Sequence, residues 1–240
     1  MNYDLTKLYR GLEQLHLSLS EQQIEQLLTY YQMLIEKNKV MNLTAITSYE
    51  EVVEKHFIDS LSLVQVLDLE KKMTVLDLGT GAGFPGIPLK IAFPNLNIVL
   101  LDSLNKRVIF LQEVIDGLAL HQIEAVHGRA EELARKKEYR ESFDLCTSRA
   151  VANLASLSEY CIPFVKVGGI FASYKSGEVE EELQQAQKAI QQLGGTVQQV
   201  HHFQLPNTDV GRSFVLIEKE RRTPKAYPRK SGTPVKNPIL

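Results

Sequence analysis

The N-terminal part of the chain carries apolar residues at helical spacing and shows no strand-like alternation of polar and apolar positions. Ser20 and Gln23 match a capping box. One helical face after them is apolar, at Ile24, Leu27, Leu28, Tyr31, Leu34 and Ile35. Ser48 and Glu51 predict the start of another helix, whose apolar positions are Val52, Val53, Phe57, Leu61 and Val64. We therefore expect residues 1–70 to form a small helical cap.

From residue 73 onward, short apolar runs alternate with helical segments, which is typical of a parallel sheet with helices on both faces. The expected strands are 74–78, 98–101, 123–126, 143–148, 168–175, 197–203 and 212–218. We therefore expect residues 71–220 to form an α/β domain with a seven-stranded, mostly parallel sheet. Residues 221–240 hold four prolines, and we expect no helix or central strand there.

The stretch TVLDLGTGAGFPG, from Thr74 to Gly86, predicts a strand, a glycine turn and a helix N-terminus. Glycine lets the backbone approach a ligand that any Cβ would displace. Segment 81–86 matches the G-x-G-x-x-G of dinucleotide-binding enzymes, a weak signal when it stands alone. Segment 77–83 matches the acid and G-x-G-x-G of S-adenosylmethionine-dependent methyltransferases. A carboxylate repels a pyrophosphate and attracts the cationic methionine end of S-adenosylmethionine, so Asp77 favours the methyltransferase pattern over the dinucleotide pattern. A turn that binds nothing is disfavoured, because four glycines in eight residues weaken packing unless something approaches closely.

Other polar residues follow the later strands. Asp102 ends the second strand, about 20 residues past the glycines, where an acid is placed to bond both ribose hydroxyls of an adenosine. Its alternative role is to cap the helix that follows it. Arg149 comes after the fourth strand, at the edge of the sheet where ligands bind, so we prefer a ligand contact to a surface ion pair. Lys175 and Arg212 also lie near strand ends, and we expect solvated charges for both.

Composition places the chain among ordinary soluble proteins, with 44% hydrophobic and 23% charged residues. No apolar run approaches the roughly 20 residues that span a bilayer, and the first residues lack the features of a signal peptide. Cys146 and Cys161 lie far apart with no C-x-x-C, so neither a metal site nor a redox pair is expected. We expect a cytoplasmic protein with no metal and no membrane association.

The formal net charge of −2 conceals an asymmetry along the chain. Residues 221–240 carry +6 and the preceding residues −8. The basic residues of this last segment are Arg221, Arg222, Lys225, Arg229, Lys230 and Lys236. An acidic body with a basic end favours a polyanionic partner at that end. Tyr227 adds a ring that can stack on a base, so RNA contact and a disordered solubility tail both remain open.

Several segments resemble motifs of the bacterial 16S ribosomal RNA guanine-N7 methyltransferase G family, also called glucose-inhibited division protein B. The distinctive one is VLDLGTGAGFPGIPL at 75–89, because most methyltransferases lack the Phe-Pro-Gly after the glycines. The others are NLTAI at 42–46, HFIDSL at 56–61, the Ala130–Glu131 pair, SRAVA at 148–152 and TPKAYPRKSGTP at 223–234. The resemblance therefore spans the chain from 42 to 234.

The resemblance implies a class I S-adenosylmethionine-dependent methyltransferase fold, which is Rossmann-like, with S-adenosylmethionine as the cofactor. In this fold the last strand, at 212–218, is expected to be inserted antiparallel. In the family, residues matching Ala130 and Glu131 contact the adenine, and an arginine matching Arg149 contacts the cofactor. Together with the patterns above, this assigns cofactor contacts to Gly79, Phe84, Asp102, Ala130, Glu131, Arg149, Asp77 and Gly81. No catalytic acid or base is implied, and Arg149 is the candidate for a catalytic role.

The helical cap holds three polar residues at helical spacing, His56, Asp59 and Ser60. Local hydrogen bonding and packing explain them from the sequence alone. The resemblance places this region beside the cofactor pocket, so a role in shaping the site stays equally open.

The resemblance implies methylation of N7 of guanine 527, in the 530 loop of 16S rRNA, by a monomer that acts on the small ribosomal subunit. Guanine N7 has a free lone pair, so the reaction needs no general base. Two alternatives remain. The match at 81–86 allows an NAD-dependent oxidoreductase, and the basic end allows a non-catalytic RNA-binding protein on the same fold.

Overall fold

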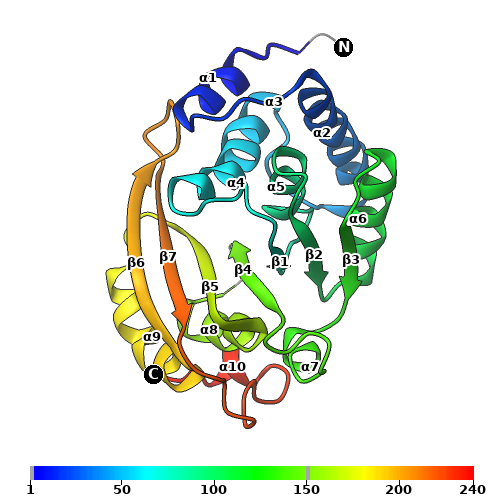
Figure 1. The fold of residues 1–240 in the computed structure, drawn as a ribbon. Helices are drawn as coiled ribbons and strands as arrows, with labels where there is room; N and C mark the ends of the chain where they lie inside the picture. The colour runs from blue at the N-terminus through cyan, green and yellow to red at the C-terminus, as the bar shows by residue number, and fades with distance from the viewer. Residues whose placement is uncertain (1–2, 150–151) are drawn as a thin grey trace.

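The computed structural model describes residues 3–149 and 152–240 of the chain (Figure 1). The N-terminal part is helical, and the described residues before position 70 include no strand, as predicted. Its helices are α1 (Thr6–Gln14), α2 (Glu21–Met41), α3 (Tyr49–Val52), the π-helical η1 (Val53–Ile58), α4 (Asp59–Leu61) and the 3-10 helix η2 (Ser62–Gln65). Ser20 and Gln23 form the predicted capping box at the start of α2.

The sheet has seven strands in the order β3-β2-β1-β4-β5-β7-β6. The strands are β1 (Thr74–Leu78), β2 (Asn97–Asp102), β3 (Ile123–His127), β4 (Phe143–Arg149), β5 (Val165–Ser176), β6 (Gly195–Gln204) and β7 (Gly211–Lys219). The first five strands pair in parallel, and β7 lies antiparallel between β5 and β6. The predicted fold class and the antiparallel insertion of the last strand are therefore confirmed.

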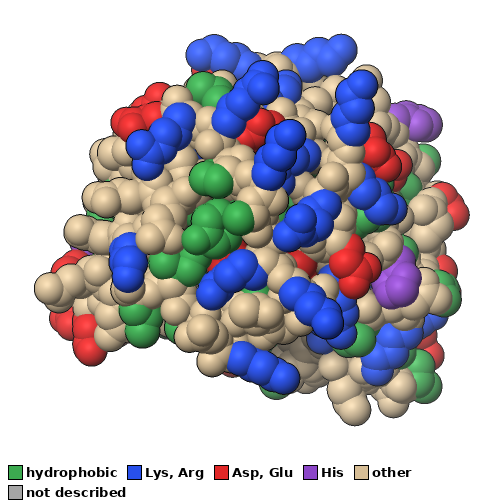
Figure 2. Space-filling model, turned by 90° about the horizontal axis from the view of Figure 1, so that it is seen from below, with side chains coloured by type: hydrophobic (Ala, Val, Ile, Leu, Met, Phe, Trp, Pro, Cys, Tyr) green, Lys and Arg blue, Asp and Glu red, His purple; other side chains and the backbone are tan. Residues whose placement is uncertain are grey.

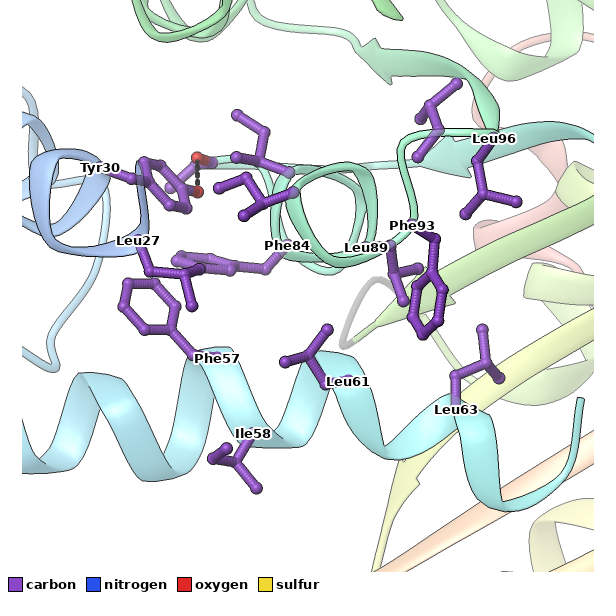
Figure 3. Packing of buried hydrophobic residues seen from close by; sticks show 14 of the residues in the cluster. Leu27, Tyr30, Phe57, Ile58, Leu61, Leu63, Phe84, Leu89, Phe93 and Leu96 are labelled. Carbon is purple, nitrogen blue, oxygen red and sulfur yellow. Dashed lines mark hydrogen bonds between the residues drawn. The ribbon is translucent and has the colours of Figure 1, made fainter. Parts of the chain in front are cut away.

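Helices cover both faces of this sheet (Figure 1). They are α5 (Gly86–Ala92), α6 (Asn105–Gly117), α7 (Ala130–Leu133), α8 (Leu154–Cys161), the 3-10 helix η3 (Ile162–Phe164), α9 (Glu180–Leu193) and α10 (Thr233–Lys236). Successive strand residues face opposite sides, so Val75 belongs to one apolar cluster and Leu76 to the other. The first cluster joins α5 and α6 to the N-terminal helices, and Figure 3 shows Tyr30, Phe57 and Phe84 meeting there.

The cap is also bonded to the sheet domain through polar contacts. Gln23 donates from Nε2 to the carbonyls of Ile91 and Ala92, at 2.7 and 3.1 Å. These carbonyls lie at the end of α5, where a helix leaves backbone acceptors unsatisfied. One residue at the start of α2 therefore caps its own helix and fixes the helix that follows the glycine turn.

The expectation that residues 221–240 form no helix is wrong, because α10 lies within them. Pro234 occupies the first turn of α10, where a missing N–H leaves no helical bond unmade. This segment is also docked on the body. Arg140 donates to the carbonyls of Thr223 and Tyr227, at 2.8 and 3.0 Å. Tyr227 packs against the second apolar cluster, so its ring is not the free stacking platform that we expected.

Candidate functional site

Asp77, on β1, holds the glycine turn that follows this strand through hydrogen bonds. Its Oδ2 accepts hydrogen bonds from Thr80 Oγ1 at 2.6 Å and from the Gly86 amide at 2.8 Å. A Cβ at Gly86 would lie 2.3 Å from Leu100 Cδ2, so only glycine fits there. Asp77 is fully buried, and burial raises its pKa to about 6. The sequence prediction put this carboxylate in contact with ligand, whereas its bonds in the structure hold the turn to α5.

No side chain covers the backbone of the turn at Gly81. Gly79 and Gly81 have φ angles of 71° and 63°, the left-handed region that favours glycine. A Cβ built on Gly81 would meet nothing closer than the Gly79 carbonyl oxygen at 4.0 Å. The turn therefore presents backbone to open space at its second glycine, as the glycine pattern predicted.

Asp102 joins the end of β2 to this turn. Its Oδ2 accepts from the Gly81 amide at 3.0 Å, and its Oδ1 accepts from the Leu104 amide at 2.9 Å. Arg107 adds an ion pair to Oδ2 at 3.3 Å. The N-cap of α6 is Leu104, and no side chain caps this helix, so the alternative role of Asp102 as a helix cap is wrong. Its role at a ribose stays a prediction.

A cavity of about 320 Å³ opens at the carboxyl ends of β1, β2 and β3. Three of the predicted residues line it, namely Gly79, Ala130 and Glu131. The lining residues that the sequence prediction did not assign to the site include Ser103, Tyr160, Gly232 and Val235. Position after a strand was a usable signal for Ser103, and the motif at 223–234 was one for Gly232, but nothing in the local sequence marked Tyr160 or Val235.

Glu131 is buried, and its contact differs from the predicted one. Its Oε1 accepts a hydrogen bond from the Gly232 amide at 2.8 Å. The carboxylate is therefore occupied by the C-terminal segment in this structure, and a contact with adenine remains a prediction.

Phe84 lies beside the cavity rather than in it. Its ring centroid is 4.4 Å from that of His56 and 5.3 Å from that of Tyr30. Tyr30 is fully buried and donates from its hydroxyl to the Ala82 carbonyl at 2.6 Å (Figure 3). Both rings therefore hold the glycine turn against the helical cap. The sequence prediction omitted Tyr30, although its spacing from Leu27 and Leu34 places it on the apolar face of α2.

A second cavity of about 410 Å³ is lined by Arg149 among other residues. Ala152 lines the first cavity. Residues 150 and 151 of the SRAVA motif lie outside the described residues. Lys175 also lines the second cavity, and its Nζ donates to the Ala152 carbonyl at 3.1 Å.

Asp59 connects the arginines of the second cavity. Its Oδ2 accepts from Arg149 Nη1 at 2.8 Å and its Oδ1 accepts from Arg212 Nε at 2.9 Å. These bonds span β4, β7 and the cap, so the local explanation of Asp59 is wrong. It holds for Ser60, whose hydroxyl donates to the His56 carbonyl.

His56 completes this network as a neutral ring. Its Nδ1 lies 3.1 Å from Arg149 Nη2, and its Nε2 lies 2.9 Å from Thr44 Oγ1. Nδ1 also lies 3.1 Å from the Lys55 carbonyl oxygen. A guanidinium only donates and a carbonyl only accepts, so Nδ1 bonds Arg149 when the ring proton is on Nε2 and bonds Lys55 when it is on Nδ1. Burial, together with the charge of Arg149, lowers the pKa of His56 to about 3.

The charges of Lys175 and Arg212 are paired, which corrects the expectation of solvated charges. Lys175 Nζ lies 2.6 Å from Glu182 Oε1, and the lysine side chain is 12% exposed. Arg212 pairs with Asp59 as described above. Both cations therefore belong to the wall of the second cavity.

The residues present fit S-adenosylmethionine. The bare turn at Gly81 leaves room for backbone contact, and Ala130 leaves the first cavity open beside it. Asp77 Oδ1 is buried with no hydrogen-bond partner among the described residues, so a carboxylate oxygen is free beneath the turn. Residues 3–149 and 152–240 contain no group of three or more His, Cys, Asp or Glu side chains able to hold a metal. No helix in these ranges is long and apolar enough to cross a bilayer.

Comparison with known proteins gives a consistent result. The family model described as rRNA small subunit methyltransferase G matches residues 23–210. A Ribosomal RNA small subunit methyltransferase G from Lachnoclostridium phytofermentans is 54% identical over 99% of this chain and 98% of its own length. A protein of the same name from Alkaliphilus metalliredigens is 52% identical over 95% of this chain and 96% of its own.

A solved structure has a similar fold, and at its low sequence identity the similarity concerns the fold only. A SAM-dependent methyltransferase from Aquifex aeolicus superposes with a TM-score of 0.51 and 18% identity. The superposition covers 70% of this chain and 92% of that one.

Proposed function

Because the chain belongs to the rRNA small subunit methyltransferase G family, we propose that it methylates N7 of a guanine in 16S rRNA. Its cofactor is S-adenosylmethionine, which supplies a methyl group carried on a positively charged sulfur. The observation that supports the site is the turn at Gly79 and Gly81, whose backbone lies in the left-handed region and whose first glycine lines the first cavity. The family and the cofactor favour this function over the NAD-dependent oxidoreductase.

The chain's contribution to the reaction is alignment. Guanine N7 needs no deprotonation, and the neutral His56 and the paired Asp59 are engaged in holding Arg149. We place the adenosine part of the cofactor in the first cavity and the guanine in the second. Arg149 lines the second cavity, and its bonds to the Asp59 carboxylate and the Lys55 carbonyl of the cap hold it there as a positioning group. Holding two reactants at near-attack distance provides a large part of the rate enhancement.

The surface that we propose for the rRNA is the basic face around the C-terminal segment. Figure 2 shows Lys and Arg side chains gathered on the face seen from below the view of Figure 1, where α10 lies. Arg135 donates to the Ala226 and Pro228 carbonyls, which brings 135–137 beside the segment. The exposed cations there are Arg135, Lys136, Lys137, Arg221, Arg222, Lys225, Lys230 and Lys236. Such cations bind phosphates by releasing counterions.

The finer features follow from the family resemblance and the basic face. We propose that the target guanine lies in the 530 loop, that the protein acts as a monomer in the cytoplasm, and that 16S rRNA of the small subunit is its partner. A base in a loop is unstacked at lower cost than one in a duplex, which suits a cavity that must receive a single base.

Mapping of 16S rRNA from a strain without the gene tests this function. We expect one guanine methylation to disappear, and to return when the gene is restored. An unchanged methylation pattern would instead support a non-catalytic RNA-binding protein. Calorimetry with S-adenosylhomocysteine and with NADH distinguishes the methyltransferase from the NAD-dependent oxidoreductase. Binding of NADH alone would contradict the methyltransferase.

A further inference from the structure

The end of the chain forms part of the wall of the first cavity. Gly232 and Val235 line it together with Gly79 and Ala130. Resting on the proposed function, we propose that residues 229–236, which we call the C-terminal strap, close the adenosine part of the cofactor pocket. In this account Glu131 and Glu159 are positioning residues that hold the strap.

The strongest anchor of the strap is an ion pair with α8. Glu159 is 1% exposed, and its Oε2 lies 2.7 Å from Arg229 Nη2. Its Oε1 also accepts from the Arg229 backbone amide at 2.6 Å and from Nε at 3.0 Å. A buried carboxylate that accepts from the amide, Nε and Nη2 of one residue fixes that residue in position, since removing the arginine would leave the Glu159 charge buried and uncompensated.

Two further anchors flank the part of the strap that meets the cavity. Glu131 Oε1 accepts from the Gly232 amide at 2.8 Å, at the start of α10. Ser156 Oγ donates to the Pro234 carbonyl at 2.7 Å, again from α8. Val235 follows directly, so its position is set by bonds to both α7 and α8.

Val235 gives the strap a surface that suits a nucleobase. Its side chain lines the cavity and is 56% exposed, although it is apolar. A planar ring placed in the cavity would cover this surface and remove it from water, which favours binding. Glu131 Oε1 accepts the Gly232 amide, so this oxygen affects adenosine binding by holding the strap in place.

Calorimetric titration of the full chain with S-adenosylhomocysteine tests the strap. Arg229 does not line the cavity, so Arg229→Ala should weaken binding at least tenfold only by releasing the strap. Arg222→Ala is the matched control, because it removes the same charge from the same segment at a side chain that is 89% exposed. The control should bind as the parent does. Limited trypsin digestion at Lys230 reports release of the strap independently of binding. A released strap with parental affinity would overturn the proposal.

A second pair of variants covers the case in which Arg229→Ala does not fold. Val235→Asp changes a half-exposed side chain and should weaken binding several-fold, while Val167→Asp makes the same change at a 52% exposed valine on β5 and should not. Equal affinities of these two variants would contradict the strap. If the parent itself fails to bind S-adenosylhomocysteine, the proposed function fails first, and the strap fails with it.

Discussion

Arg149 and Asp59 lie 90 positions apart in the chain, and their Nη1 and Oδ2 atoms are 2.8 Å apart. The pair joins the end of β4 to the helical cap, and both side chains belong to residues that line the second cavity. Its side chains are 15% and 4% exposed, so the pair is shielded from solvent. The cap is therefore part of the site, because one of its carboxylates sets the position of an arginine on the sheet.

Asp59→Asn should reduce both stability and methyl transfer. The substitution keeps the shape but leaves Arg149 and Arg212 without their shared counter-charge, which costs about 3 kcal/mol for a buried pair. Urea denaturation and a methyl-transfer assay measure the two effects. Asp68→Asn is the control, since Asp68 pairs with Lys71 on the surface and its side chain is 55% exposed. Parental activity in Asp59→Asn would show that the arginines need no such positioning.

Gly81→Asp should abolish cofactor binding and leave the fold intact. The new side chain would point into the open space above the turn, and the left-handed backbone costs about 1 kcal/mol for a residue other than glycine. Gly86→Ala should instead lower the thermal stability of the fold, because its Cβ would lie 2.3 Å from Leu100 Cδ2. Calorimetry and thermal unfolding separate the two variants. Normal binding by Gly81→Asp would place the pocket elsewhere.

Asp77 should make the free energy of unfolding depend on pH. Its pKa is about 6 in the folded chain against 3.8 normally, so the folded state binds the proton more tightly. Its contribution is therefore fully present below about pH 4 and is lost as pH rises through 6, on the order of 3 kcal/mol.

Comparison with Asp77→Asn isolates this effect. The variant cannot titrate at this position, and the depressed pKa of His56 contributes equally to both proteins. Denaturation series from pH 4 to 7 should show the parent losing stability relative to the variant. Parallel curves would mean that Asp77 keeps an ordinary pKa.

Three exposed lysines of the C-terminal segment should account for part of the salt dependence of RNA binding. Replacing Lys225, Lys230 and Lys236 by Gln removes up to three phosphate contacts, so the slope of log K against log salt should fall by about 2 to 3. The control replaces three other exposed lysines, Lys39, Lys71 and Lys72. Equal slopes in both triple variants would move the RNA surface away from this segment.

Deleting 221–240 would be a poor substitute for those variants. Thr223, Pro228 and Pro234 are buried, and Lys219 Nζ donates to Thr223 Oγ1 at 2.7 Å. The deletion would therefore open the body of the protein as well as remove charge.

The fold was predictable because its signals are local. Short apolar runs, the glycines after β1 and the acid at the end of β2 follow from backbone and strand geometry, and the structure has them where the sequence placed them. The antiparallel place of β7 was expected from the resemblance to methyltransferases and is confirmed.

The contacts that assemble the site were not predictable in the same way. Asp59 meets Arg149 and Arg212 only when the cap folds onto the sheet, and no local pattern encodes that contact. The basic C-terminal segment had the composition of a free tail, yet Glu131 and Glu159 hold it on the body. These contacts join residues that are far apart in the sequence, and the spacing of residues along the chain does not predict such contacts.

The most direct test of the central claim is the product of the purified protein. Small subunits that lack the modification are incubated with methyl-labelled S-adenosylmethionine, and the labelled nucleoside is identified after digestion of the 16S rRNA. We predict a single labelled product, 7-methylguanosine, and its loss in Gly81→Asp. A label on an exocyclic amino group, or none at all, would contradict the account.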